Sequence, residues 1–214
     1  MVWTFSIAFV VLIAALAIFW PKPAPLTLDY SKMPTIGSAD AKVKITEFGD
    51  FKCPVCARFS QEIMPKIKAE FIDTGKASFS YQNWTIISPQ ADSFTAAVAG
   101  QAIYHQSNDA FWQFYDGMLK NQRPETETWA TSEFILNLAK EQGWSVDLDK
   151  LKHDIENQTY AKEVRSQNRF AEKNRFTGTP TVLINGERLP DSVALNYDNL
   201  KAAIEKALQQ PEQQ

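Results

Sequence analysis

Cysteine and histidine are scarce in this sequence, with two of each in 214 residues. A tetrahedral zinc site needs four such ligands, and His105 and His153 lie far from the cysteines without ligand spacing, which disfavours zinc. A large excess of charge of one sign is also lacking. The formal net charge is -3, with no basic cluster and no acidic tail, so we expect no nucleic-acid partner. The sequence shows no internal repeat or low-complexity block, and its ordinary apolar content indicates a folded protein.

One long stretch lacks charge altogether. Residues 3–20 (WTFSIAFVVLIAALAIFW) are almost wholly apolar, and about 20 helical residues span a bilayer core. Trp3 and Trp20 stand at the two ends, where aromatic rings favour the membrane interface. We predict a single-pass transmembrane anchor over residues 1–21. A cleaved signal peptide and a buried helix are the alternatives, although no basic residue precedes the run and its only small-residue motif lies inside it.

The rest of the chain divides by composition. The Pro-rich residues 22–34 predict a stalk and lead-in, residues 35–208 a folded domain, and residues 209–214 a tail. Lys22 follows the apolar run and no basic residue precedes it, which alone weakly favours a cytoplasmic domain. The redox chemistry described below favours an oxidising compartment instead, so we expect an extracytoplasmic domain on the cell membrane.

Hydrophobic periodicity predicts the order strand, helix, strand, helical insertion, hairpin, helix. This order indicates an α/β fold whose mixed sheet carries an all-helical insertion at about residues 89–175. Pro65 should kink the first helix, and Gly75 should end it. The expected strands cover residues 42–48, 77–82 and a hairpin at 181–189 around Asn185-Gly186. The expected helices cover residues 53–73, 91–105, 110–120, 132–142, 148–156, 160–176 and 199–208.

The two cysteines form the motif Cys53-Pro54-Val55-Cys56 at the start of the first predicted helix. Unpaired N–H groups and the positive end of the helix dipole stabilise a thiolate there. Thiolate is the attacking and the leaving species in disulfide exchange. A purely structural disulfide is the alternative, but a loop this short gives little entropic stabilisation. We therefore expect redox chemistry, with Cys53 at the helix tip exposed and Cys56 more buried.

Three segments carry a resemblance to a known family: ITEFGDFKCPVC (45–56), AFWQF (110–114) and FTGTPTVLING (176–186). With them the chain resembles the DsbA-like thiol–disulfide oxidoreductases of the thioredoxin superfamily, most closely the membrane-anchored Gram-positive type, over about residues 30–208. The resemblance implies a thioredoxin-like fold and the oxidation of unfolded secreted proteins. It also implies reoxidation by a quinone-linked membrane thiol oxidase. Some similar proteins bind calcium, so the resemblance allows a calcium site, but no loop here has ligand spacing strong enough to assign one. No cofactor is required beyond the redox-active disulfide.

The resemblance also implies roles for residues around the dithiol. Pro180 is expected to follow a cis peptide bond, with the Thr179 backbone contacting the substrate chain; an ordinary trans proline is the alternative. Glu47 is expected to be a buried proton acceptor for Cys56, the alternative being a solvent-facing glutamate. Strong oxidants of the family carry a histidine where this chain has Val55, and Pro54 removes one N–H donor, so the oxidising strength stays open.

Three alternative functions are also compatible with this sequence. A membrane-tethered reductase or isomerase would keep the fold and reverse the direction of electron flow. A chaperone-like binding module would bind unfolded proteins in a surface groove and would not need the thiols. A glutathione-dependent transferase on the same fold is disfavoured because it usually needs no Cys-x-x-Cys pair. We expect a monomeric dithiol oxidase.

Overall fold

The computed structural model describes residues 24–211. The anchor expected over residues 1–21 and the last residues of the tail lie outside this part of the chain. Among residues 24–211, no helix combines the length and the apolar character needed to cross a membrane. The domain boundaries predicted above stay predictions.

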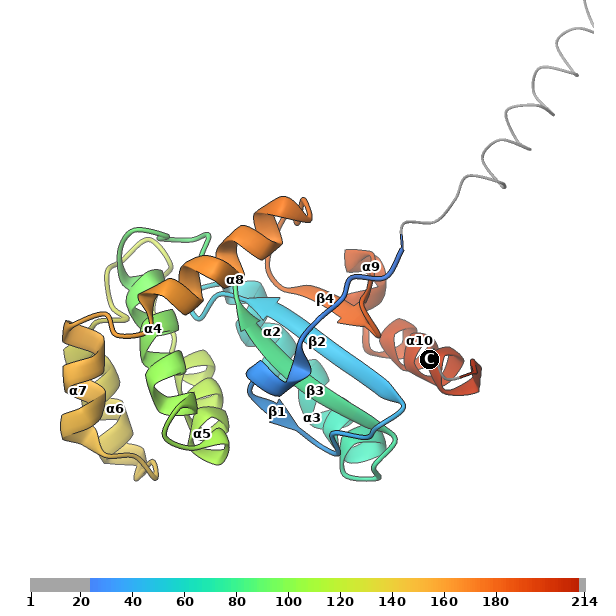
Figure 1. Cartoon of the computed structure of the whole chain (residues 1–214), viewed down its shortest axis with the longest axis horizontal. Helices are drawn as coiled ribbons and strands as arrows, with labels where there is room; N and C mark the ends of the chain where they lie inside the picture. Colours follow the sequence, from blue (N-terminus) through green and yellow to red (C-terminus); the bar gives the residue numbers. More distant parts are fainter. Residues whose placement is uncertain (1–23, 212–214) are drawn as a thin grey trace, which may run out of the picture.

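A five-stranded mixed sheet forms the centre of the domain (Figure 1). The strand order is β1-β3-β2-β4-β5; β2 and β3 are parallel, and every other pair is antiparallel. The strands are β1 (Thr35–Ile36), β2 (Val43–Gly49), β3 (Ala77–Asn83), β4 (Thr181–Ile184) and β5 (Glu187–Arg188). Six of the seven β2 residues and all seven of β3 are buried. Strands of this kind are covered on both faces of the sheet.

The first long helical segment follows β2 and packs against one face of the sheet. It alternates α- and π-helical turns: α2 (Pro54–Arg58), η2 (Phe59–Ile63), α3 (Met64–Ile67) and η3 (Lys68–Ile72). The sequence predicts a kink at Pro65; in the structure a π-helical turn, η2, directly precedes α3, which contains Pro65. A proline ring clashes with the carbonyl group four residues earlier, and a widened turn relieves this clash. Gly75 ends the segment with a φ of 74°.

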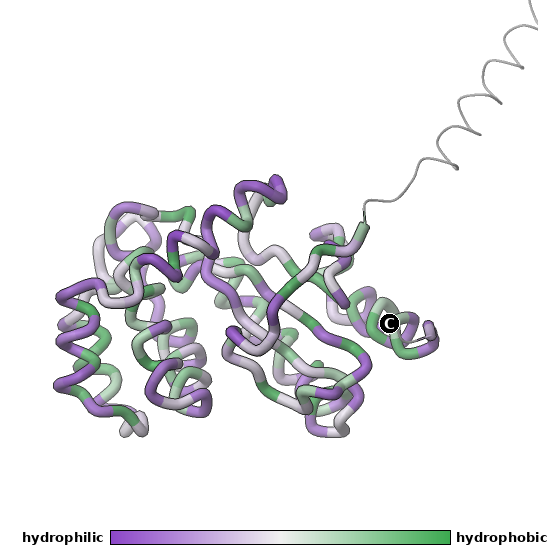
Figure 2. The backbone as a smooth tube through the Cα atoms, in the orientation of Figure 1, coloured by the Kyte–Doolittle hydropathy of each residue, from purple (hydrophilic) through white to green (hydrophobic). Residues whose placement is uncertain are grey.

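The helical insertion lies beside the sheet, and α8 runs from it back to β4 (Figure 1). Its helices are α4 (Asp92–Tyr104), α5 (Asn108–Lys120), α6 (Ser132–Gln142), α7 (Leu148–Glu156) and α8 (Ala161–Lys173). Side chains of Ser107, Thr131 and Asp147 cap the N-termini of α5, α6 and α7. Hydrophobic and hydrophilic residues alternate along α6 and α7 (Figure 2). The thioredoxin-like α/β fold with a helical insertion, expected from the sequence, is therefore present.

The C-terminal part turns sharply after β4. Asn185 and Gly186 both have positive φ values, 49° and 81°, as a two-residue hairpin turn requires. The second strand, β5, lies one residue earlier than expected. Two helices complete the chain, α9 (Asp191–Ala194), which the sequence did not reveal, and α10 (Tyr197–Gln209).

Buried aromatic rings join the insertion to the sheet next to the cysteine motif. Phe51, just before the motif, packs its ring 4.7 Å from that of Phe114 of α5 and 5.1 Å from that of Tyr81 of β3. Tyr115 of α5 packs 5.4 Å from Tyr81. Aromatic pairs at such distances stabilise beyond simple area burial. The insertion is thus fixed to β3 and to the loop that leads into the motif.

Candidate active site

The two cysteines lie where β2 passes into α2. Cys53 is the N-cap residue of α2, and Pro54 occupies the first helical position, where its missing N–H leaves no helical hydrogen bond unmade. Both thiols are free. Cys56 is 1% exposed, more buried than Cys53, as expected. Cys53 is itself only 5% exposed, so the expectation of an exposed residue at the helix tip is wrong; the Thr179 segment covers it.

The surroundings of Cys53 favour its thiolate. Hydrogen bonding with the Cys56 side chain lowers the pKa of Cys53 to about 6, against the opposing effect of burial. Contact with Thr179 and hydrogen bonds from the backbone N–H groups of Cys56 and Val55 lower this pKa further. The N–H contributions are those of a helix N-terminus. Val55 itself is half-buried and supplies no charge, so the thiolate is stabilised without the histidine of the strong oxidants.

The second thiol lies in the opposite environment. Burial raises the pKa of Cys56 well above its ordinary value, and Cys53 and Glu47 raise it further. At neutral pH one sulfur of the pair is therefore largely ionised and the other is protonated. Such a division assigns attack on external disulfides to Cys53.

Glu47 lies beneath this pair, on the inward face of β2, and is fully buried, which rules out the solvent-facing alternative. Burial raises the pKa of Glu47 to about 8, while hydrogen bonding with Tyr115 and Cys56 lowers it and the charge of Cys53 raises it. The Tyr115 hydroxyl donates to Glu47 Oε2 at 2.6 Å. A carboxyl group with this pKa can both give and take a proton near neutral pH.

The segment before β4 closes the site from the other side. The Thr179–Pro180 peptide bond is cis, which confirms the expected geometry. The Cys53 thiol donates to the Thr179 carbonyl oxygen, with Sγ and O 3.2 Å apart. The Thr179 hydroxyl is buried without a hydrogen-bond partner among the described residues. Thr179 is thus placed to meet a chain bound at Cys53.

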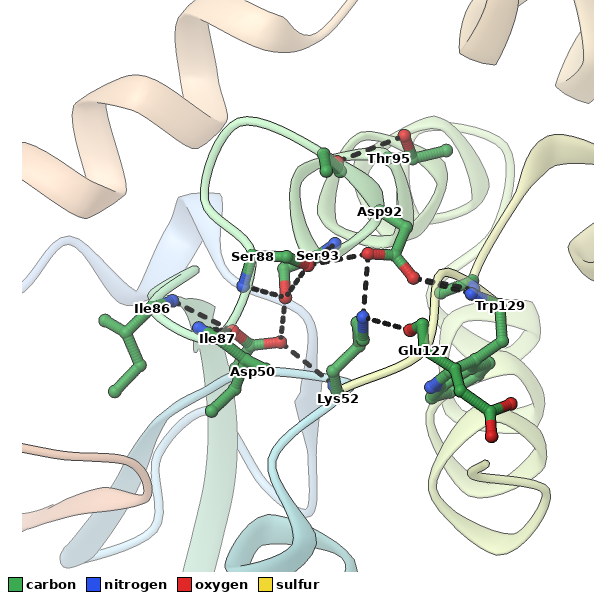
Figure 3. Close-up of polar contacts among 12 residues, drawn as sticks. Asp50, Lys52, Ile86, Ile87, Ser88, Asp92, Ser93, Thr95, Glu127 and Trp129 are labelled. Atoms are coloured by element: carbon green, nitrogen blue, oxygen red, sulfur yellow. Dashed lines mark hydrogen bonds and ion pairs between the residues drawn. The ribbon is translucent and has the colours of Figure 1, made fainter. Parts of the chain in front are cut away.

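A buried ion pair holds the residue next to Cys53 (Figure 3). The Lys52 ammonium group donates to Asp92 of α4 at 2.8 Å and to the Glu127 carbonyl oxygen at 2.7 Å. Both charged side chains are buried. Asp92 also accepts from the backbone N–H of Trp129 at 2.8 Å. Burial raises the pKa of Asp92, but these hydrogen bonds outweigh it and lower the pKa to about 2.

Asp50 forms a second buried group in the same loop (Figure 3). Its carboxylate accepts hydrogen bonds from the backbone N–H groups of Ile86 and Ile87 and from the Ser93 hydroxyl, each at 2.9 Å. Its own backbone carbonyl accepts from the Cys53 N–H at 3.0 Å. Asp50 therefore connects the start of the motif to the insertion.

Sequence reasoning missed three site residues of the insertion, in addition to Asp50 and Lys52 of the loop. Gln122 donates through Nε2 to the carbonyl oxygens of Phe51 and Cys53 at 2.8 and 3.0 Å; Tyr115 and Asp92 make the contacts described above. All three belong to the insertion, far from the motif in sequence. One signal was present, because Lys52 stands in a buried loop and a lysine seldom occupies such a place without an acidic partner.

Comparison with known proteins assigns the family. A family model described as Thioredoxin matches residues 30–206. The chain belongs to this thioredoxin family. Within the family it is 39% identical over 180 residues to a protein named "Probable disulfide bond formation protein D" from Bacillus anthracis, covering 84% of this chain and 80% of that one. It is 32% identical over 175 residues to "Disulfide bond formation protein D" from Bacillus subtilis, covering 82% and 77%.

Solved structures of the family agree with this assignment. Oxidised BdbD from Bacillus subtilis superposes with a TM-score of 0.80 at 29% identity, covering 89% of this chain and all of that one. DsbA from Chlamydia trachomatis gives a TM-score of 0.72 at 26% identity, covering 87% and 95%. The chain is therefore a DsbA-like thiol–disulfide oxidoreductase, and Cys53 and Cys56 are the two cysteines of its sequence.

The resemblance allows a calcium site, but the sequence assigns no ligands to it. In the part of the chain that the structure describes, no three His, Cys, Asp or Glu side chains gather in a way that could hold a metal ion. The chemistry below uses only the residues of the dithiol site.

Proposed function

We propose that this protein is a dithiol oxidase that introduces disulfide bonds into secreted or cell-surface proteins. The observation that carries the direction is the contrast between the two thiols, with the pKa of Cys53 lowered to about 6 and that of Cys56 raised. A stabilised thiolate on Cys53 favours the reduced form of the pair. The oxidised form is then a good acceptor of electrons from substrate thiols.

The exchange proceeds in two substitutions at sulfur. A substrate thiolate attacks Cys53 Sγ, the Cys53–Cys56 bond breaks, and Cys56 leaves as a thiolate that takes the proton of the Glu47 carboxylic acid. A second substrate thiolate then attacks the substrate sulfur of the mixed disulfide, and Cys53 leaves as its stabilised thiolate. The substrate has lost two electrons and the enzyme has gained them. The Thr179 backbone would hold the substrate chain as an added strand.

In reoxidation, Cys53 is the attacking thiolate, and Glu47 accepts a proton instead of giving one. The Cys53 thiolate attacks a disulfide of the oxidising partner and forms a mixed disulfide with it. The Glu47 carboxylate takes the Cys56 proton, and the Cys56 thiolate attacks Cys53 Sγ to restore the enzyme disulfide and release the partner thiolate. We propose a quinone-linked membrane thiol oxidase as this partner, as the family resemblance implies. An anchor at residues 1–21 would hold the domain on the outer side of the cell membrane, close to that partner.

Trapping of mixed disulfides tests this function. With Cys56→Ala, the intramolecular escape is lost, so secreted proteins should accumulate on Cys53 as mixed disulfides that thiol reductants release. Cys53→Ala is the matched control and should trap none. If the Cys56→Ala protein collects no secreted partners, or collects cytosolic proteins instead, the proposed function or the proposed location is wrong.

The equilibrium potential of the protein against glutathione tests the direction of electron flow. An oxidase should lie clearly on the oxidising side of glutathione. A potential near the reducing end of the family range, about −270 mV, would favour the tethered reductase.

A further inference from the structure

One hydroxyl group of the helical insertion contacts Glu47, the proposed proton-transfer group. Tyr115 of α5 is 2% exposed, and its hydroxyl donates to Glu47 Oε2 at 2.6 Å. Tyr115 makes the only well-formed hydrogen bond to the Glu47 carboxyl group within residues 24–211, and Cys56 lies close enough to interact with it. The other oxygen, Oε1, is buried and has no well-formed hydrogen bond among the described residues.

A second tyrosine, Tyr81, lies beside Glu47 without donating a hydrogen bond to its carboxyl group. Tyr81 stands opposite Glu47 in the parallel register of β2 and β3, and its hydroxyl is buried without a partner in the described part of the chain. Both groups crowd around Gly49, where a Cβ would lie 2.9 Å from Glu47 Oε1 and 3.2 Å from the Tyr81 hydroxyl oxygen. A larger residue at position 49 would displace one of them.

We infer that Tyr115 is a positioning residue that holds the Glu47 carboxyl group through Oε2, leaves Oε1 free to exchange a proton with Cys56, and keeps enough of the carboxylate form for the proton-accepting step. The inference rests on the proposed role of Glu47. It gives the insertion a part in the redox chemistry in addition to any part in binding substrate.

The physical basis is the asymmetry of the hydrogen bond. A hydroxyl donated to a carboxylate stabilises the charged form more than the neutral acid. Tyr115 therefore lowers the pKa of Glu47, which burial alone would raise further. The titratable groups that face Glu47 are Cys53 and Cys56 from the motif, Tyr81 from β3 and Tyr115 from α5.

The test is the rate of the closing step as a function of pH. The reduced full-length protein is mixed with oxidised glutathione, quenched with acid at intervals, and analysed by mass spectrometry for conversion of the Cys53–glutathione mixed disulfide into the Cys53–Cys56 disulfide. In the wild type this rate should rise with pH around a midpoint at the pKa of Glu47, which burial holds well above its ordinary value of 4.5.

Tyr115→Phe keeps the buried ring and removes the hydroxyl. The midpoint should move up by about one pH unit, which makes closure about tenfold slower at pH 7. Tyr81→Phe, the matched control, removes a buried hydroxyl that makes no hydrogen bond and should leave the midpoint in place. Direct titration of the Glu47 carboxyl carbon by NMR should show the same upward shift in Tyr115→Phe alone.

Glu47→Gln separates the failure of this inference from that of the proposed function. If Glu47→Gln abolishes the pH dependence while Tyr115→Phe behaves like the wild type, the inference about Tyr115 is overturned and the role of Glu47 stands. A Tyr81→Phe shift equal to that of Tyr115→Phe would also overturn it, because packing alone would then explain both. If Glu47→Gln closes like the wild type, the role of Glu47 fails, and the inference fails with it.

Discussion

At the scale of single residues, the site depends on groups whose charge states are shifted in opposite directions. Cys53 and Cys56 were identifiable from the sequence because a Cys-x-x-Cys pair before a helical pattern has few other uses. Thr179, Pro180 and Glu47 were placed through the family resemblance. The burial of Cys53 could not be predicted, because the covering carbonyl group belongs to Thr179, 126 residues away along the chain. Tyr115 was not predicted for the same reason, because it lies far from Glu47 along the chain.

Glu47 should make folding stability depend on pH. Its pKa is raised from 4.5 to about 8 in the folded state, so its contribution is full below about pH 4.5 and is lost as the pH rises toward 8. In the oxidised protein neither cysteine titrates and the Cys53 charge no longer raises the pKa of Glu47, so burial alone keeps it high. There Glu47→Gln should remove this loss and raise the free energy of unfolding at pH 8 by about 2–4 kcal/mol. Urea unfolding between pH 5 and pH 8 measures it.

Glu62→Gln is the matched control for this experiment. Glu62 lies in η2 and is exposed, so its substitution should leave the pH profile of stability unchanged. A wild-type protein that is equally stable at both ends of the range would show that Glu47 is not a buried, protonated acid.

At the scale of elements, local patterns predicted most of the fold. The bounds of α6 and α7 agree with the sequence because each has a capping residue and a regular apolar face. The π-helical turns of the first helical segment were not predicted, because apolar residues at every fourth position indicate a continuous α-helix. The strand β1 has two residues, too few for a period-two pattern to be recognised. The strand β5 is equally short and was placed, to within one residue, by the Asn185-Gly186 turn before it.

The ion pair between Lys52 and Asp92 should contribute strongly to the docking of α4 on the redox loop. Asp92→Ala would leave a buried ammonium group without its carboxylate, and we expect a loss of about 3–5 kcal/mol in the free energy of unfolding. Asp73→Ala breaks the exposed pair with Lys68 and should cost less than about 1 kcal/mol. Denaturant unfolding at neutral pH compares the two variants.

The same ion pair predicts acid sensitivity. The pKa of Asp92 is lowered from 3.8 to about 2, so its stabilisation is present above about pH 4 and is lost as the pH falls toward 2. If Asp92→Ala lowers the free energy of unfolding no more than Asp73→Ala does, the buried pair does not hold the loop.

At the scale of the whole molecule, the domain carries the entire dithiol site within residues 24–211, while residues 1–23 carry the apolar run. We therefore expect a protein that begins at residue 24 to leave the membrane fraction and to keep the Cys53 reactivity of the full chain. Cell fractionation and the rate of reaction with oxidised glutathione measure the two properties. An equally membrane-bound truncated protein would contradict the predicted anchor, and a changed rate would show that the first residues contribute to the site.

The account as a whole depends on Cys53 being ionised at neutral pH. The most direct measurement is the ultraviolet thiolate absorbance of the reduced protein as a function of pH, with the oxidised protein as the blank. We predict a transition for one thiol with its midpoint at about pH 6, while Cys56 stays protonated to far higher pH. A first transition near the ordinary cysteine value of 9.0 would contradict the account.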